Sequence, residues 1–296
     1  MINVSYVTTG NEGIASFRYR VLAPAQEMSK HLIIPKVSRL ADKDAAIVIF
    51  SKHWTYNDWS YANFCKKRGQ KVIFDVCDDH TEGKLSDHYH RMLDVAHTIT
   101  CNSKEMARII KEKTGKVAVV IEDPVLSPRM AYDPDLPTSL CWYGQAMNIQ
   151  GLYDVYTPDC TYPLEIALPG NVQPPAHFQA PWIRWTPWHK DIIPSLAERN
   201  TVAVLPYRQG KEAKSANRVL EALQCGMVVL TDPIPSVQEL PKAGIAYLDR
   251  PINEIMVEIR GWNWELEIQK AQAYIEKHYS PEAIAEKWVQ VFKEIA

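Results

Sequence analysis

The sequence lacks several features that would narrow its class at once. None of its six cysteines forms a C-x-x-C pair, which excludes the usual zinc-ribbon and redox motifs. No apolar run approaches the roughly 18 residues of a membrane-spanning helix, and the first residues resemble no signal peptide. The net charge of −2 lacks the excess of one sign that is typical of nucleic-acid or membrane binding. We therefore expect a cytoplasmic protein whose cysteines are buried free thiols.

What is present is an alternation of short apolar runs and helical stretches along 296 residues, enough for two α/β domains. Such an alternation predicts βαβ units around parallel sheets. In the first part we expect strands at 2–7, 31–35, 45–50, 71–75, 97–100 and 116–121, and helices at 16–29, 58–68, 85–95 and 103–113. In the second part we expect strands at 139–143, 164–168, 182–185, 201–205, 227–231 and 245–248, helices at 190–198, 215–225 and 235–240, and a helical tail from about 252.

A proline-rich stretch separates the two alternations. Four prolines between 122 and 137 rule out a continuous helix or a central strand there. We predict an N-terminal Rossmann-like domain at 1–124, a linker at 125–138 and a C-terminal Rossmann-like domain at 139–280. Two such domains imply a cleft, and ligands in these folds lie beyond the carboxyl ends of the strands.

The most specific segment follows the strand expected at 201–205. A polar loop leads into a helix that begins near Ser215, and a helix start with free N–H groups suits a diphosphate. Lys214 adds a point charge there. Asn217 and Glu221 are four residues apart, so they share one helix face, where Glu221 is a candidate acceptor for ribose hydroxyls. The alternative is an ordinary amphipathic helix with solvated charges.

This segment resembles the donor-site region of the "group 1", family 4-like glycosyltransferases of GT-B fold. Their hallmark, Lys-Ser-x-x-Arg-x-x-Glu-Ala-x-x-x-Gly-x-Pro-Val-Val followed by Asp-x-Pro, is matched densely between Lys214 and Pro235. The resemblance implies that Glu221 binds the donor ribose, and that Ser215, Ala216 and Asn217 bind its diphosphate. It departs at Ala213, where many members carry a second glutamate.

The resemblance also implies further donor contacts. Gly144 lies in the loop after the first strand of the second domain, and Trp188 and His189 lie where such enzymes seat the nucleobase. Arg208 is a candidate phosphate cation beside Lys214. For Trp182, Trp185 and Trp188 the alternative is core packing.

In the first domain, a glycine loop follows the first strand. Gly13 allows close backbone approach, and the next helix start again suits an anion. By resemblance this loop faces the donor phosphates and the acceptor, with Arg18 and Arg20 as candidate cations. Either arginine is equally compatible with a solvated surface position.

Asp78 and Asp79 follow the strand expected at 71–75 and are candidates to bind acceptor hydroxyls or to act as a base. His53 is a second candidate base. The alternatives are a helix N-cap for one aspartate and a surface position for His53. His88 and His90 do not share a helix face, so we expect no metal site.

These patterns together predict a glycosyltransferase that moves a hexosyl or pentosyl group from a nucleotide-diphosphate sugar, with UDP as the expected nucleotide, to an acceptor hydroxyl. The resemblance implies a metal-independent, retaining reaction without a cofactor, and a last helix, 281–296, that returns to the first domain. The acceptor stays open between a glycan or lipid-linked sugar and a hydroxylated DNA base, and the oligomeric state stays open too. The alternatives are a nucleotide-sugar-binding protein without transfer activity and an epimerase-like enzyme of similar fold.

Overall fold

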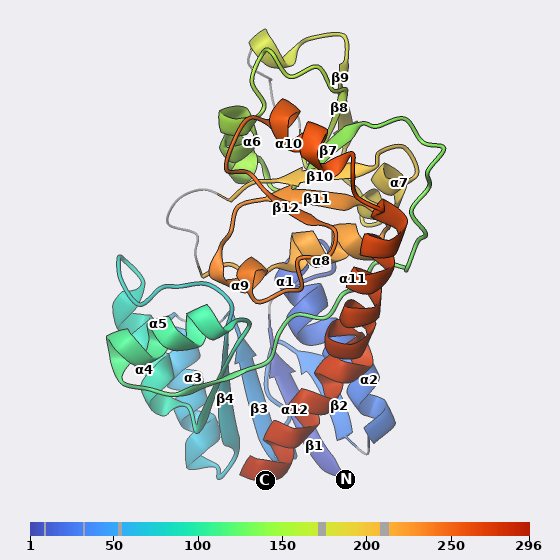
Figure 1. Cartoon of the computed structure of the whole chain (residues 1–296). Helices are drawn as coiled ribbons and strands as arrows, with labels where there is room; N and C mark the ends of the chain where they lie inside the picture. Colours follow the sequence, from blue (N-terminus) through green and yellow to red (C-terminus); the bar gives the residue numbers. More distant parts are fainter. Residues whose placement is uncertain (9, 32, 53–54, 171–175, 208–212) are drawn as a thin grey trace. The chain divides into compact units, whose positions relative to one another are not determined.

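The computed structural model divides the chain into two compact units. The first comprises Met1–Leu126, Ala213–Ser215 and His278–Ala296, and the second comprises Ser127–Glu212 and Ala216–Lys277. The structure describes residues 1–8, 10–31, 33–52, 55–170, 176–207 and 213–296. Each unit is a parallel sheet of six strands with helices (Figure 1).

The first unit has the strand order β2-β1-β3-β4-β5-β6, and every neighbouring pair is parallel. Its strands are β1 (Ile2–Val7), β2 (Ile33–Ser38), β3 (Ile47–Ser51), β4 (Lys71–Val76), β5 (Thr98–Cys101) and β6 (Ala118–Val120). Its helices are α1 (Ala15–Phe17), the π-helical turn η1 (Arg18–Leu22), α2 (Ala23–Met28), η2 (Ser29–His31), α3 (Tyr56–Lys67), α4 (Ser86–Val95), α5 (Lys104–Thr114) and α12 (Pro281–Ile295).

The second unit has the order β12-β11-β10-β7-β8-β9, again with parallel neighbours. Counted within the unit, this is the 3-2-1-4-5-6 order of a dinucleotide-binding fold. Its strands are β7 (Leu140–Tyr143), β8 (Leu164–Leu168), β9 (Ile183–Pro187), β10 (Val202–Leu205), β11 (Val228–Thr231) and β12 (Ile245–Tyr247). Its helices are η3 (Ala146–Asn148), α6 (Ile149–Val155), η4 (Ala176–Phe178), α7 (Ile192–Ala197), α8 (Asn217–Gln224), α9 (Pro235–Gln238), α10 (Ile252–Ile259) and α11 (Trp264–Tyr279), whose last two residues count with the first unit.

The central strands form because they are continuous apolar runs, as expected for strands covered on both faces. All five residues of β3 and all four residues of β7, β10 and β11 are buried. The structure adds α6 between β7 and β8, which our sequence analysis did not expect. It also divides the single helix expected at 16–29 by the π-helical turn η1.

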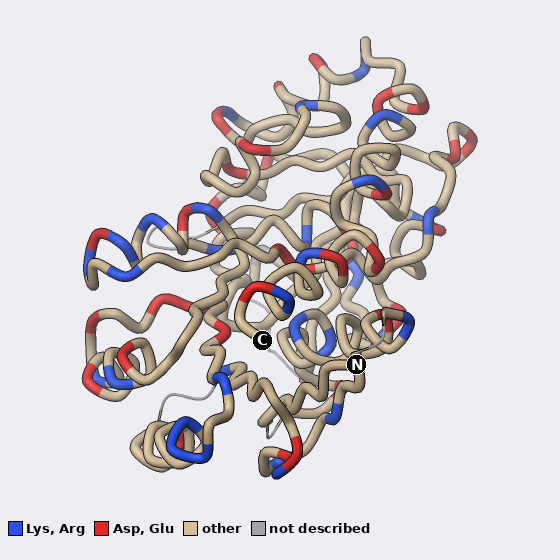
Figure 2. The backbone as a smooth tube through the Cα atoms, turned by 90° about the horizontal axis from the view of Figure 1, so that it is seen from below, with Lys and Arg blue, Asp and Glu red and all other residues tan. Residues whose placement is uncertain are grey.

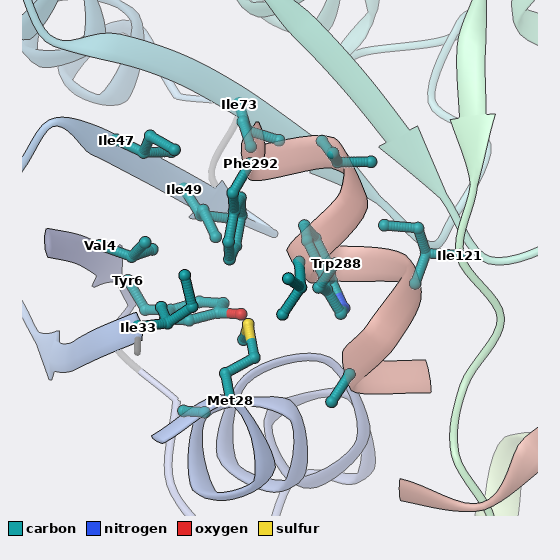
Figure 3. Packing of buried hydrophobic residues seen from close by; sticks show 14 of the residues in the cluster. Val4, Tyr6, Met28, Ile33, Ile47, Ile49, Ile73, Ile121, Trp288 and Phe292 are labelled. Carbon is teal, nitrogen blue, oxygen red and sulfur yellow. The ribbon is translucent and has the colours of Figure 1, made fainter. Parts of the chain in front are cut away.

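The C-terminal helix α12 completes the core of the first unit. Trp288 and Phe292 point from α12 towards Tyr6 of β1 and Ile49 of β3 (Figure 3), and all four side chains are fully buried. The helix begins with Ser280, whose hydroxyl accepts a hydrogen bond from the backbone N–H of Ala283. The two ends of the chain therefore meet in one hydrophobic cluster.

The segment between the alternations contains no helix or strand from 121 to 139. We expected the linker to begin at 125. The structure instead groups Val125 and Leu126 with the first unit, where the N–H of Val125 donates to the carbonyl of Tyr279 at 2.8 Å. From Ser127 onward the segment belongs to the second unit.

Candidate functional site

Each sheet has one point where the chain reverses its direction of strand addition. In the second unit this point lies between β7 and β10, and in the first unit it lies between β1 and β3. In open parallel sheets ligands bind beyond the carboxyl ends of the two strands that flank such a switch point. These two edges therefore locate the candidate site residues of each unit.

In the second unit, Arg218 joins the ends of both flanking strands. Its Nη1 donates to the carbonyl of Tyr143 at 3.4 Å, and its Nη2 donates to the carbonyl of Pro206 at 3.2 Å. The guanidinium also lies 4.8 Å from the ring centroid of Tyr207. In return the Tyr143 hydroxyl donates to the Arg218 carbonyl at 2.5 Å. The start of α8 is thereby fixed to the switch point.

Gly144 lies at this edge, directly after β7. A Cβ atom added to it would lie 3.1 Å from the Trp142 ring and 3.3 Å from Nη1 of Arg218. This spacing is tighter than ordinary van der Waals contact, so a side chain would displace Arg218. The glycine thus permits the close packing of the β7 end against α8.

Helix α8 begins without a side-chain cap. Its N-cap is Ala216, which makes no side-chain hydrogen bond, and alanine is a poor N-cap residue. By contrast, α3, α5 and α12 are capped by Thr55, Ser103 and Ser280. The first turn of α8 also contains no acidic residue. The positive end of its dipole is therefore not neutralised by a side chain of its own first turn.

Glu221 lies one turn further along α8. It is 2% exposed, and its Oε2 accepts a hydrogen bond from the backbone N–H of Ser127 at 2.8 Å. The carboxylate thus binds the chain's own backbone. The apolar face of α8, with Leu220 and Leu223 each 2% exposed, packs into the unit as the amphipathic pattern predicted.

The candidate nucleobase residues follow the edge strand β9. The N–H of Trp188 donates to the carbonyl of Leu168 at 3.1 Å, which holds this turn against the end of β8, and His189 is exposed. Of the neighbouring tryptophans, Trp185 donates its Nε1–H to the Phe178 carbonyl, whereas Trp182 is 51% exposed.

In the first unit, the glycine loop after β1 is closed by hydrogen bonds of its own. The N–H of Gly13 donates to Oδ1 of Asn11 at 2.9 Å. Arg18, which starts the π-helical turn, donates from Nη1 to the carbonyl of Glu12 at 2.6 Å. Arg18 therefore lies at the loop, where we expected it.

Arg20 does not lie in that loop, and we revise the expectation that it binds phosphate. It is 1% exposed and donates to both carboxylate oxygens of Asp75, to Asp123 at 3.2 Å and to the carbonyl of Ile121. Its guanidinium lies 5.6 Å from the ring centroid of Trp288. The residue is thus a buried structural cation, because its donors are directed into the core of the unit.

Asp78 follows β4 and joins two lysines. Its Oδ2 lies 2.8 Å from Nζ of Lys52, directly after β3, and its Oδ1 lies 2.5 Å from Nζ of Lys214. Burial would raise the pKa of Asp78, but the two ammonium groups outweigh burial and hold the pKa well below its usual range. Asp78 is therefore a firmly ionised carboxylate.

Asp79 is held by different partners. Its Oδ1 accepts from the N–H and the hydroxyl of Thr81, and Nζ of Lys113 lies 3.5 Å from its Oδ2. Burial opposes ionisation, yet these hydrogen bonds and Lys113 lower the pKa of Asp79. The neighbouring His80 has a lowered pKa because burial outweighs the nearby carboxylates. Carboxylates with lowered pKa values are weak proton acceptors near neutral pH.

Two of the residues expected in the site, His53 and Arg208, lie outside the described residues. The structure also brings forward Lys52 and Arg218, to which the sequence analysis gave no role. Arg218 lies within the donor-site segment, but its contacts to Tyr143 and Pro206 depend on the sheet order. Within the described ranges, no group of three His, Cys, Asp or Glu residues is arranged to hold a metal ion, and no helix is long and apolar enough to cross a membrane.

No protein-family model matches the chain, and no curated protein sequence matches it. Solved structures do share its fold. HepE of Anabaena, solved with UDP and glucose, has a TM-score of 0.71 at 11% identity, covering 99% of this chain and 100% of HepE. The apo form of WaaB, a lipopolysaccharide outer core galactosyltransferase, has a TM-score of 0.61 at 11% identity, covering 99% of this chain and 100% of WaaB. A mutant of T4 phage BGT in complex with UDP-glucose has a TM-score of 0.61 at 11% identity, covering 99% of each chain.

These proteins are glycosyltransferases of GT-B fold, and the expected α/β architecture with two Rossmann-like units is confirmed. Identities near one tenth establish a shared fold rather than a shared substrate, because one fold hosts many activities. The activity must therefore be argued from the site.

Proposed function

We propose that the chain is a glycosyltransferase of the family 4-like type that transfers a sugar from a UDP-sugar to an acceptor hydroxyl. The observation that carries the proposal is the start of α8 at the β7–β10 switch point, where the N-cap residue Ala216 makes no capping hydrogen bond and Arg218 fixes the helix to the sheet. A helix N-terminus in this place is a ready-made anion site. The fold shared with HepE, which was solved with UDP and glucose, supports the same reading.

On the donor side, we assign the backbone at Ala216 and Asn217 to the diphosphate, with Ser215 and Lys214 directly before them in the chain. Glu221 lies on the same helix and is assigned to the ribose. Trp188 supplies an aromatic face for the base, beside His189. Gly144, directly after β7, lets Arg218 pack at this edge, where we place the donor.

The physical task of the enzyme is to stabilise the diphosphate as it departs. Cationic side chains and oriented N–H groups stabilise this charge without a metal ion, so we propose a metal-independent reaction. Lys214, Arg208 and Arg18 are the candidate cations. We further propose retention of configuration at the anomeric carbon, based on the resemblance between Lys214 and Pro235, and a proton NMR spectrum of the product tests it.

The three candidate bases differ in their suitability. Asp78 and Asp79 have lowered pKa values, so we assign them to binding rather than to proton transfer. His53 is the remaining candidate, and a histidine side chain is the usual proton acceptor near neutral pH. We therefore propose His53 as the group that accepts the acceptor proton.

The acceptor is proposed only as a hydroxyl compound. The net charge is −2, and Lys and Arg positions are interspersed with Asp and Glu positions along the described backbone (Figure 2), so charge gives no reason to prefer DNA over a glycan or a lipid-linked sugar. Acceptor trials should therefore include all three classes, with DNA containing a hydroxylated base among them.

The test is a thermal-shift series with nucleotide diphosphates and their sugars, followed by transfer assays. We expect UDP-sugars to stabilise the protein, by about 2.7 kcal/mol at a hundredfold excess over Kd, and to be consumed with a suitable acceptor. If no nucleotide or nucleotide sugar raises the melting temperature, the proposal is wrong. Stabilisation without transfer would identify a binding protein, and conversion of the free nucleotide sugar without an acceptor would identify an epimerase-like enzyme.

A further inference from the structure

An aromatic pocket lies at the edge of the second unit's sheet that is opposite the candidate donor site. Its volume is about 340 Å³, and its lining includes Tyr132, Thr138, Arg260, Trp262, Trp264 and Glu265. Thr138 precedes β7, so the pocket lies at the amino-terminal ends of the strands, whereas the donor residues lie beyond the carboxyl ends. The donor assignments above therefore do not account for this pocket.

The turn between α10 and α11 carries the two indoles of the pocket. The carbonyl of Ile259 accepts from the N–H of Trp262 at 3.0 Å and from Nε1 of Trp264 at 2.5 Å. Trp264 is 9% exposed and packs against the ring of Tyr132, with 5.8 Å between the centroids. Trp262 is half-buried, and its indole makes no hydrogen bond or ring contact with any described residue. Trp264 is thus a fixed wall, and Trp262 is the indole left to contact a ligand.

The wall that carries Tyr132 is also fixed before any ligand binds. The N–H of Met130 donates to the carbonyl of Gln224 at 2.9 Å, and its carbonyl accepts from Nε2 of Gln272 at 2.7 Å. Burial raises the pKa of Tyr132, and the charge of Asp133 adds to this effect, so the hydroxyl stays protonated and able to donate. A preformed wall reduces the entropy that binding must cost.

Polar groups surround the indole of Trp262. Arg260 and Glu265 carry opposite charges, and neither forms an ion pair within the part of the chain that the structure describes. Arg260 donates from Nη2 to the hydroxyl of Tyr162 at 2.8 Å. Asn263 caps α11 through its Oδ1, which accepts from the N–H of Leu266 at 3.1 Å and leaves the amide N–H groups to donate. Because the two lining charges cancel, the pocket favours a neutral ligand with many hydroxyls over a phosphate.

A second aromatic pocket lies at the same edge. Its volume is also about 340 Å³, and its lining includes Tyr156, Thr157 and Trp182. Trp182 directly precedes β9 and is 51% exposed. Tyr162 links the two pockets, because its hydroxyl accepts from Arg260 and its carbonyl accepts from the Tyr156 hydroxyl, each at 2.8 Å. This edge therefore presents two indoles, each in its own pocket, to one extended ligand.

We propose that the amino-terminal edge of the second unit binds a neutral oligosaccharide, with one sugar ring on Trp262 and another on Trp182. A sugar ring presents C–H groups on its faces and hydroxyls at its rim, which matches an indole surrounded by a carboxylate, a guanidinium and an amide. An apolar peptide would instead bury Arg260 and Glu265 without partners, which costs free energy. The site goes beyond the proposed transfer reaction and does not depend on it.

The test is calorimetry on full-length proteins with maltohexaose, cellohexaose and chitohexaose, and with a polyproline peptide as the competing kind of ligand. The variants are Trp262→Ala, Trp262→Phe and Trp182→Ala. The matched control is Tyr56→Ala, which removes a side chain that is 55% exposed on α3 of the first unit. Thermal unfolding of each variant checks its fold.

We expect the wild type to bind at least one hexasaccharide. Trp262→Ala and Trp182→Ala should each weaken that binding about tenfold, while Trp262→Phe, which keeps an aromatic face, should retain most of it. Tyr56→Ala should leave it unchanged. The inference is wrong if the wild type binds none of the three hexasaccharides, if it binds the polyproline peptide alone, or if either alanine variant at a tryptophan binds as tightly as the wild type. Failure of the proposed function would appear separately, as a wild type that binds no nucleotide or nucleotide sugar.

Discussion

At the scale of single residues, Arg18 and Arg20 are two positions apart and lie in opposite surroundings. Arg18 is partly exposed and braces the glycine loop through the carbonyl of Glu12, whereas Arg20 is buried against Asp75. Both fall in a π-helical turn, whose spacing differs from that of an α-helix and changes which side chains face inward. The residue type alone therefore does not reveal which arginine lies at the glycine loop and which is buried in the core.

Glu221 gives the sharpest prediction for the donor side. Glu221 is buried on α8 and accepts a hydrogen bond from the backbone N–H of Ser127, so the substitution must preserve its size and an acceptor oxygen. Glu221→Gln does both and removes only the charge. We expect UDP-sugar binding to weaken about 10- to 100-fold, since a charged hydrogen bond to ribose contributes about 1.5–3 kcal/mol. Calorimetry measures the change, with the exposed Glu254→Gln on α10 as the control. Unchanged affinity in a folded Glu221→Gln protein would remove the ribose assignment.

At the scale of elements, the end of α8 is as tightly specified as its start. Gly226 follows the helix with φ +84°, and a Cβ there would lie 2.7 Å from the backbone oxygen of Ala131. Gly115 ends α5 with φ +71°, and a Cβ there would meet nothing within 4 Å. Both glycines end helices in the left-handed conformation, but one alone is packed against a neighbouring backbone.

These two glycines make a matched pair. Gly115→Ala should cost about 1–2 kcal/mol, from the left-handed conformation alone. Gly226→Ala should cost at least about 1 kcal/mol more, because the segment at Ala131 must move. Thermal unfolding, with amide hydrogen exchange followed in each unit, measures both. Equal losses in the two variants would show that the contact with Ala131 contributes nothing.

At the scale of the whole molecule, the chain closes the first unit with its last helix. Trp288, about 280 positions from Tyr6, lies 6.4 Å from it between ring centroids. We expect Trp288→Ala to cost about 3–5 kcal/mol of stability, since the cavity would lie in the centre of the core. Phe64→Ala, at a position 51% exposed on α3 of the same unit, should cost under about 1 kcal/mol. Similar losses in chemical unfolding would contradict this account of the core.

The sequence by itself determined the succession of strands and helices along the chain and singled out the segment from Lys214 to Glu221 as a candidate donor site. The spacing of hydrophobic residues, the apolar runs and the start of a helix are local properties, which residues near one another in the chain specify directly. It also placed Asp78 after a strand and Gly144 after another. The local sequence patterns did not predict α6 or the π-helical turn that contains Arg20.

Only the tertiary structure decided which of these residues meet. Lys52 and Asp78 follow adjacent strands although 26 positions separate them, and Lys214 reaches the same carboxylate from a segment 136 positions beyond Asp78. Arg218 acquires its contacts because β7 and β10, distant in sequence, are neighbours in the sheet. The order of the strands in a sheet depends on long-range packing, which no local pattern encodes. This order sets the switch points, where charged side chains and the start of α8 lie.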